Sequence, residues 1–171
     1  MGKLKTTTLQ LSAALFLLTL VSCEVEELTG EAPRDPDKLK EYNQRKMTIE
    51  QGVSGTVFFE EGNCMPPRGD SCRTYPVIRT VRIYAFTTEK EAAGDGPFYS
   101  GVSTQLIATA TSDKDGFYQA ALSPGKYSLF IEEDSLLYAN QTDQKGGILV
   151  AVIDSGWVTM IHPEITYKAV Y

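Results

Sequence analysis

The stretch that decides the fold is Thr111–Leu129, which reads TSDKDGFYQAALSPGKYSL. It contains two turn signals, Asp115-Gly116 and Pro124-Gly125, where glycine permits unusual backbone angles and proline fixes φ. Between and after these turns, apolar residues recur at every second position. The two apolar sets are Tyr118, Ala120 and Leu122, and then Tyr127, Leu129 and Ile131. This period of two predicts two strands, each with one buried face.

The same period continues through the last two thirds of the chain. Together the patterns predict seven short strands, over residues 53–59, 77–87, 106–111, 117–122, 126–132, 148–153 and 157–170. Pro163 has no amide hydrogen for a ladder, so it predicts a bulge or an edge within the last strand. Seven strands with no helix among them favour an all-β fold, a β-sandwich, with a barrel as the alternative.

The stretch 111–129 resembles the core motif of the carboxypeptidase regulatory-like domain, a transthyretin-like β-sandwich. The residues that carry the resemblance are Asp115-Gly116, Tyr118, Pro124-Gly125-Lys126-Tyr127, Gly52–Val57 and Val81–Ala85. The resemblance implies a seven-stranded, transthyretin-like Greek-key sandwich over residues 52–171. The loop after the first strand and the loop Glu89–Gln105 are both longer than the family pattern, and additions at loops are where function tends to settle.

The N-terminus has the features of a signal peptide. A basic start with Lys3 and Lys5 precedes an apolar stretch from about Leu9 to Val21. This order is typical of a secretory leader, and the stretch is shorter than the roughly 20 apolar residues that span a bilayer. One interpretation is an ordinary signal peptide that is cut elsewhere, with Cys23 buried in it.

The other interpretation is a lipoprotein signal, because the run Leu20-Val21-Ser22-Cys23 resembles the processing motif of bacterial lipoproteins. The resemblance implies removal of residues 1–22 and attachment of acyl chains, such as palmitate, to Cys23. It also implies an outer-membrane location, with the body facing the periplasm or the cell surface. We favour this interpretation, so the membrane, reached through this anchor, is the first expected partner.

Residues 23–51 are predicted to form an acidic tether that carries the lipidated Cys23. Asp35-Pro36 is typical of a helix N-cap followed by proline at the first helical position. A short helix over Asp37–Ile49 would place Leu39, Tyr42 and Lys46 on one face. Because that apolar face is thin, we expect a flexible spacer rather than a stable helix.

Cys64 and Cys72 remain as an even pair, which an oxidising compartment would join. They enclose residues 65–71, a loop-forming string with two prolines and one glycine. A zinc site is the alternative, but it needs more Cys or His ligands, and the only His is the distant His162. We predict a disulfide, which is expected to contribute about 2.5 kcal/mol to stability.

The charge of the chain argues against nucleic acid as a partner. The formal charge is −6, and loss of residues 1–22 removes Lys3 and Lys5 but no acid. The remaining 14 basic and 22 acidic side chains give 14 − 22 = −8. Since no Lys/Arg cluster offsets this acidity locally, we expect no nucleic-acid binding.

The sequence offers no catalytic set. His162 is alone and is expected to be structural. Asp113 and Asp115 resemble a fragment of a calcium loop, but calcium needs further oxygen ligands, so a hairpin turn is the preferred interpretation. We therefore predict no enzymatic activity, no cofactor and no metal site.

Loop aromatics give the one indication of a ligand. Phe98 and Tyr99 lie in a Gly/Pro-containing loop, and Tyr138 lies beside Asn140 in another. These rings could form a platform for a sugar, although we favour their packing against the ends of the sandwich. The leading hypothesis is a non-enzymatic, lipid-anchored envelope module with a protein or glycan partner, and a carbohydrate-binding surface lipoprotein is the alternative.

Overall fold

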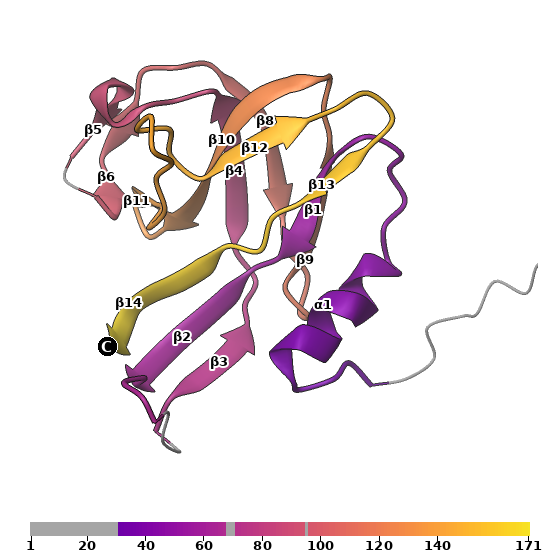
Figure 1. The fold of residues 1–171 in the computed structure, drawn as a ribbon, viewed down its shortest axis with the longest axis vertical. Helices are drawn as coiled ribbons and strands as arrows, with labels where there is room; N and C mark the ends of the chain where they lie inside the picture. Colours follow the sequence, from indigo (N-terminus) through magenta and orange to yellow (C-terminus); the bar gives the residue numbers. More distant parts are fainter. Residues whose placement is uncertain (1–30, 68–70, 95) are drawn as a thin grey trace, which may run out of the picture.

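The computed structural model describes residues 31–67, 71–94 and 96–171, and these residues are mostly in β-strands (Figure 1). In chain order the elements are α1 (Pro36–Gln44), β1 (Gly52–Thr56), β2 (Phe58–Asn63), β3 (Arg73–Pro76), β4 (Thr80–Ala85), the 3-10 helix η1 (Glu89–Glu91), β5 (Ala92–Ala93), β6 (Phe98–Tyr99), β7 (Gly101–Val102), β8 (Leu106–Thr111), β9 (Phe117–Ala121), β10 (Gly125–Glu133), β11 (Leu136–Tyr138), β12 (Val150–Ile153), β13 (Val158–Met160) and β14 (Glu164–Val170).

Two three-stranded sheets have β1 and β2 as their central strands, and these two strands follow one another in the chain. In the first, β1 lies between parallel β13 and antiparallel β9, and in the second, β2 lies between parallel β14 and antiparallel β3. The predicted strand 53–59 is interrupted at Val57, whose N–H donates to the carbonyl of Gly116 at 2.9 Å. The predicted strand 157–170 is likewise divided at Pro163, and β14 carries a further irregularity between Ile165 and Lys168.

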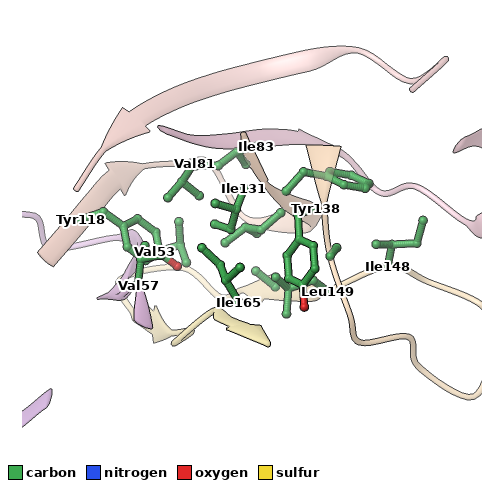
Figure 2. Close-up of a cluster of buried hydrophobic side chains, with 14 of the residues drawn as sticks. Val53, Val57, Val81, Ile83, Tyr118, Ile131, Tyr138, Ile148, Leu149 and Ile165 are labelled. Atoms are coloured by element: carbon green, nitrogen blue, oxygen red, sulfur yellow. The ribbon is translucent and has the colours of Figure 1, made fainter. Parts of the chain in front are cut away.

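A larger sheet has the strand order β6-β11-β10-β4-β8, and β12 also pairs with β10. Side chains from it meet side chains from β1, β2 and β14 in one buried core (Figure 2). Tyr118 and Tyr138 are the largest of the fully buried side chains in this core. Within the described ranges the sheets do not close into a barrel, so the barrel alternative is wrong.

The turn after β8 confirms one prediction and corrects another. The Gly116 N–H donates to the carbonyl of Asp113 at 2.9 Å, and Gly116 has φ +76°. A Cβ on Gly116 would lie 2.6 Å from the carbonyl oxygen of Val57, so glycine is required there. However, β8 pairs with β4 whereas β9 pairs with β1, so the turn joins different sheets instead of closing a hairpin.

Helix α1 corrects the prediction of a free spacer up to residue 51. It contacts β1 and β3, and Figure 1 shows it lying against these strands. Leu39 is only 1% exposed, and Asn43 is equally buried. The apolar face of the helix is thin, as the sequence indicated, but the buried contacts hold the helix on the sheet. The folded body therefore includes residues 36–51.

The expanded loop between β4 and β8 supplies β6, the edge strand of the larger sheet. It contains η1 and the short strands β5, β6 and β7, and β6 pairs with β11. The Tyr99 ring meets the Phe130 ring of β10 edge-on, with centroids 5.6 Å apart, and Tyr84 meets the same ring at 5.6 Å. Phe130 is therefore fully buried even though it lies on the opposite face from Leu129 and Ile131.

Candidate functional site

The predicted anchor, Cys23, lies outside the described residues, as does the rest of the predicted leader. The structure therefore bears on the part of the chain that comes after the anchor. Across the ranges 31–67, 71–94 and 96–171, no helix combines the length and apolar character needed to cross a membrane. Within residues 31–67, the first element on the C-terminal side of the predicted anchor is helix α1.

Helix α1 starts as the sequence predicts. The Asp35 carboxylate accepts a hydrogen bond from the backbone N–H of Lys38 at 3.0 Å, and Pro36 occupies the first turn. The helix then brings Leu39 and Asn43 against the sheet, and the Lys40 ammonium lies 5.6 Å from the centroid of the Phe58 ring. A capped start and a buried face together explain why this short helix is stable.

Two polar side chains join α1 and the residues after it to the turn that precedes β9. The Asn43 amide donates to Thr56 Oγ1 at 3.0 Å and to the Asp115 carbonyl at 2.8 Å. The Lys46 ammonium donates to the carboxylates of Asp113 at 2.9 Å and Asp115 at 2.6 Å. We call Asn43, Lys46, Asp113 and Asp115 the helix clamp.

The clamp gives the carboxylates of Asp113 and Asp115 a cationic partner from the chain itself. Lys46 supplies the positive charge between the two carboxylates. Burial lowers the pKa of Lys46, but the hydrogen bonds and charges of Asp115 and Asp113 outweigh it and leave this pKa raised. Burial raises the pKa of the Asp115 carboxyl, but the hydrogen bonds and charges of Lys46 and Lys114 outweigh burial and leave this pKa lowered. Both shifts favour the charged pair.

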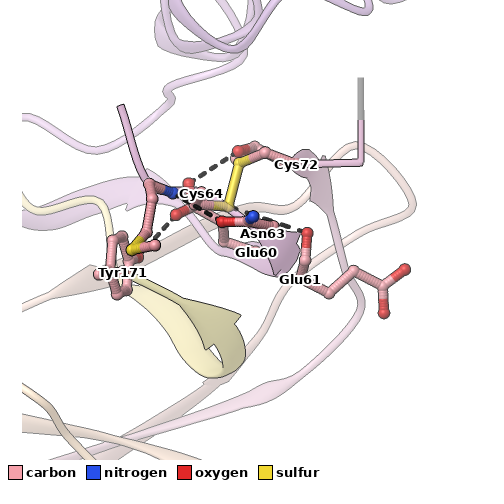
Figure 3. The surroundings of a disulfide bond; sticks show 8 residues. Glu60, Glu61, Asn63, Cys64, Cys72 and Tyr171 are labelled. Carbon is pink, nitrogen blue, oxygen red and sulfur yellow. Dashed lines mark hydrogen bonds between the residues drawn. A yellow bond between two sulfur atoms is a disulfide. The ribbon is translucent and has the colours of Figure 1, made fainter. Parts of the chain in front are cut away.

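The predicted disulfide is present between Cys64 and Cys72, with a Cα–Cα distance of 4.8 Å (Figure 3). The Glu60 carboxylate lies beside it and is buried, where it accepts hydrogen bonds from Tyr171 Oη at 2.6 Å and Thr74 Oγ1 at 2.9 Å. Glu60 and the two sulfurs are close enough together to suggest metal ligands. Because the sulfurs are bonded to each other, they are not thiolate ligands, and the group is a structural cluster.

The three aromatics predicted as a possible platform do not form one. Tyr99 and Tyr138 are buried and Phe98 is half-buried. Phe98 meets Tyr138 with ring centroids 5.1 Å apart, and the Tyr138 hydroxyl accepts the backbone N–H of Thr166 at 3.0 Å. These rings pack into the body, which is the alternative that the sequence analysis favoured.

Sequence analysis missed a different set of rings that reaches the surface next to Phe98 and Tyr138. Tyr167 contacts both of them, with centroids at 5.2 and 5.8 Å, and it also meets Phe59 at 5.3 Å. Tyr75 stacks on the other side of Phe59, at 5.8 Å and an interplanar angle of 26°. Tyr75 is 38% exposed and Tyr167 is 41% exposed. An aromatic run therefore extends from the core to solvent.

Charged residues border these two exposed rings. Arg73 pairs with Glu61 at 2.7 Å, and the Lys168 ammonium lies 5.6 Å from the Phe59 centroid and 5.8 Å from the Tyr167 centroid. We call Tyr75, Tyr167, Glu61, Arg73 and Lys168 the tyrosine patch. No signal within β3 alone distinguishes Tyr75 from other half-buried strand residues, because the patch depends on which strands are neighbours.

The single histidine has a structural contact. His162 Nδ1 accepts the backbone N–H of Thr56 at 3.1 Å, which links β1 to the segment before β14. Burial lowers the pKa of His162, and the nearby Lys40 charge lowers it further. A neutral ring is the form that can accept this hydrogen bond.

Comparison with known proteins gives no match. No family model, no curated protein sequence and no solved structure is significantly similar to this chain. The function is therefore argued from the residues and their geometry.

Proposed function

We propose that this protein is a non-enzymatic module of the bacterial cell envelope, held on the outer membrane by lipid on Cys23. Its body is proposed to be a transthyretin-like Greek-key β-sandwich. The motif Leu20-Val21-Ser22-Cys23 supports the anchor. The mostly β body with a shared core, and the turn residues of 111–129, support the sandwich.

The observation that carries this proposal is the run Leu20-Val21-Ser22-Cys23. Because α1 and the helix clamp hold the chain on the sheets from residue 36 onward, twelve residues, 24–35, connect the proposed anchor to the docked helix. Twelve residues reach about 40 Å even when fully extended. The body would therefore stay close to the membrane surface, as expected for a module that works at the envelope.

Lipid alone is sufficient for this attachment. Each buried CH₂ of an acyl chain contributes about 0.8 kcal/mol, and two or more chains hold a protein stably on a bilayer. The protein's acidic charge would keep the body itself off anionic headgroups. The anchor would then be the main membrane contact.

The test is mass spectrometry of the mature N-terminus together with membrane fractionation. We expect a chain that begins at an acylated Cys23, and we expect Cys23→Ser to leave the protein soluble or uncut. The matched control is the double variant Cys64→Ser/Cys72→Ser, which removes cysteines but should stay in the membrane fraction. An unmodified N-terminus, or unchanged partitioning of Cys23→Ser, would refute the anchor.

A further inference from the structure

Strand β2 places two rows of residues on the face that carries the tyrosine patch. In the first row, Phe59 pairs with Tyr75 on β3 and with Ile165 on β14. In the second row, Glu61 pairs with Arg73 on β3 and with Lys168 on β14. Because side chains two apart on a strand share a face, the aromatic row and the charged row lie side by side.

The irregularity in β14 brings Tyr167 into this arrangement. The register shifts between Ile165 and Lys168, so two residues of β14, Thr166 and Tyr167, lie opposite one residue of β2, Glu60. The Tyr167 ring reaches Phe59, and its hydroxyl donates to the Glu133 carboxylate at 3.1 Å. Arg79 also pairs with Glu133. Tyr167 is thereby fixed in place while remaining 41% exposed.

The Tyr75 ring lies over Phe59 at a small interplanar angle of 26°, and the residue is 38% exposed. Its hydroxyl interacts with the Glu61 carboxylate. An apolar ring face with polar groups at its edge matches the shape of a sugar, which offers C–H groups on one face and hydroxyls around its rim. Arg73 and Glu61 provide donors and acceptors beside this face.

Most charges at the tyrosine patch are paired. Arg73 pairs with Glu61, and Arg79 pairs with Glu133 beside Tyr167. Among the described residues Lys168 has no carboxylate partner, and its ammonium lies over the Phe59 and Tyr167 rings. An anionic group on the ligand would complement this cation.

We propose that the tyrosine patch binds a short carboxylated oligosaccharide. A sugar ring stacks on Tyr75, and the sugar carboxylate pairs with Lys168. The acidity of the rest of the protein disfavours long polyanions, so a short acidic glycan is the better match. This site requires only the folded body, and its occupancy does not depend on whether Cys23 carries lipid.

The test uses the full chain, purified in detergent, and isothermal titration with trigalacturonic acid. Its neutral methyl ester and a tetraglutamate peptide are the comparison probes. We expect the acid to bind more tightly than both, and Tyr75→Ala to weaken its binding about tenfold. Lys168→Met should weaken binding of the acid and remove its advantage over the ester.

Two control variants distinguish binding at this site from nonspecific binding elsewhere on the surface. Trp157→Ala removes a ring that is 72% exposed on the turn between β12 and β13, and Lys126→Met removes an exposed charge on β10. Both should bind trigalacturonic acid within about twofold of the unmodified protein. Because Tyr75→Ala could perturb folding, Arg73→Gln serves as a second patch variant, with thermal unfolding measured for each.

Four results would overturn the proposal. They are no binding of trigalacturonic acid, equal binding of the acid and its ester, equal or tighter binding of tetraglutamate, and equal losses in Trp157→Ala and Tyr75→Ala. None of them bears on the lipid anchor, which mass spectrometry tests separately.

Discussion

The two faces of strand β2 are covered in different ways. On one face, Phe58 lies under the Lys40 side chain of α1, and Glu60 lies beside the disulfide. On the other face, Phe59 is covered by Tyr75 and Tyr167, which remain well exposed. The helix side is thus closed by buried contacts, whereas the tyrosine side packs Phe59 into the core and reaches solvent at Tyr75 and Tyr167. We infer that both faces serve stability and that the exposed rings of the second are available for a ligand.

The largest expected effect is on the closed face. Leu39→Ala removes a side chain that is 1% exposed between α1 and the sheet. We expect the free energy of unfolding to fall by about 3 kcal/mol, because a buried leucine is replaced by a cavity. Urea denaturation checks this, with the exposed Leu136→Ala as the control. Equal effects of the two variants would mean that α1 does not unfold together with the sheets.

The disulfide beside Glu60 is the next contribution to that face. The double variant Cys64→Ser/Cys72→Ser opens a ring that spans eight residues of sequence separation. Loss of this constraint on the unfolded chain is expected to cost about 2.5 kcal/mol. Denaturation of the untreated protein with and without reductant provides an independent measurement. If neither treatment lowers the midpoint, the closed face does not depend on the covalent link.

The helix clamp should make the closed face sensitive to pH. The folded-state pKa of Asp115 is lowered from 3.8, so its contribution is complete above that value and is lost as pH falls through the folded pKa. Conversely, the pKa of Lys46 is raised from 10.5, so its contribution is present below that value and is lost as pH rises through the folded pKa. The clamp is therefore strongest between these limits.

Lys46→Met should lower the free energy of unfolding at neutral pH by about 1 kcal/mol. It should also make this free energy decrease less steeply as the pH falls into the acid range. Unfolding free energies measured from neutral pH down to strongly acid conditions would check both expectations. Lys114→Met is the matched control, because Lys114 pairs with the same Asp115 carboxylate but is largely exposed. An unchanged acid slope in Lys46→Met would show that the clamp does not couple helix docking to protonation.

The contrast between the faces also shows how far the sequence could lead. Alternation predicted the strand at β10, but the expectation of one buried face was wrong there, because Leu129, Phe130 and Ile131 are all buried. The Cys pair predicted the disulfide. Neither pattern could place α1, because the covering of Phe58 depends on a contact between distant segments. The consecutive run Val57-Phe58-Phe59 was a usable signal, since three buried neighbours imply that both faces of the strand are covered.

The tyrosine patch lay further beyond sequence reasoning. Strand β3 has only four residues and ends in Pro76, and the sequence pattern predicts no strand over these residues. The stacking of Tyr75 on Phe59 follows from the register of β3 with β2, and that register cannot be known without the strand order. By contrast, Phe98, Tyr99 and Tyr138 are predicted to lie in loops, whereas the structure places them in the paired strands β6 and β11 and packs their rings inward.

The smallest effect on stability is expected from the open face. Tyr75→Ala removes a half-exposed ring that stacks on Phe59, and we expect the free energy of unfolding to fall by less than about 1 kcal/mol. Urea denaturation beside Leu39→Ala gives the comparison directly. A loss as large as that of Leu39→Ala would assign Tyr75 to the core and remove the basis for treating the two faces differently. A small loss of stability combined with clearly weaker saccharide binding would separate the two roles, because a ring that served only the fold would affect binding only by destabilising the protein.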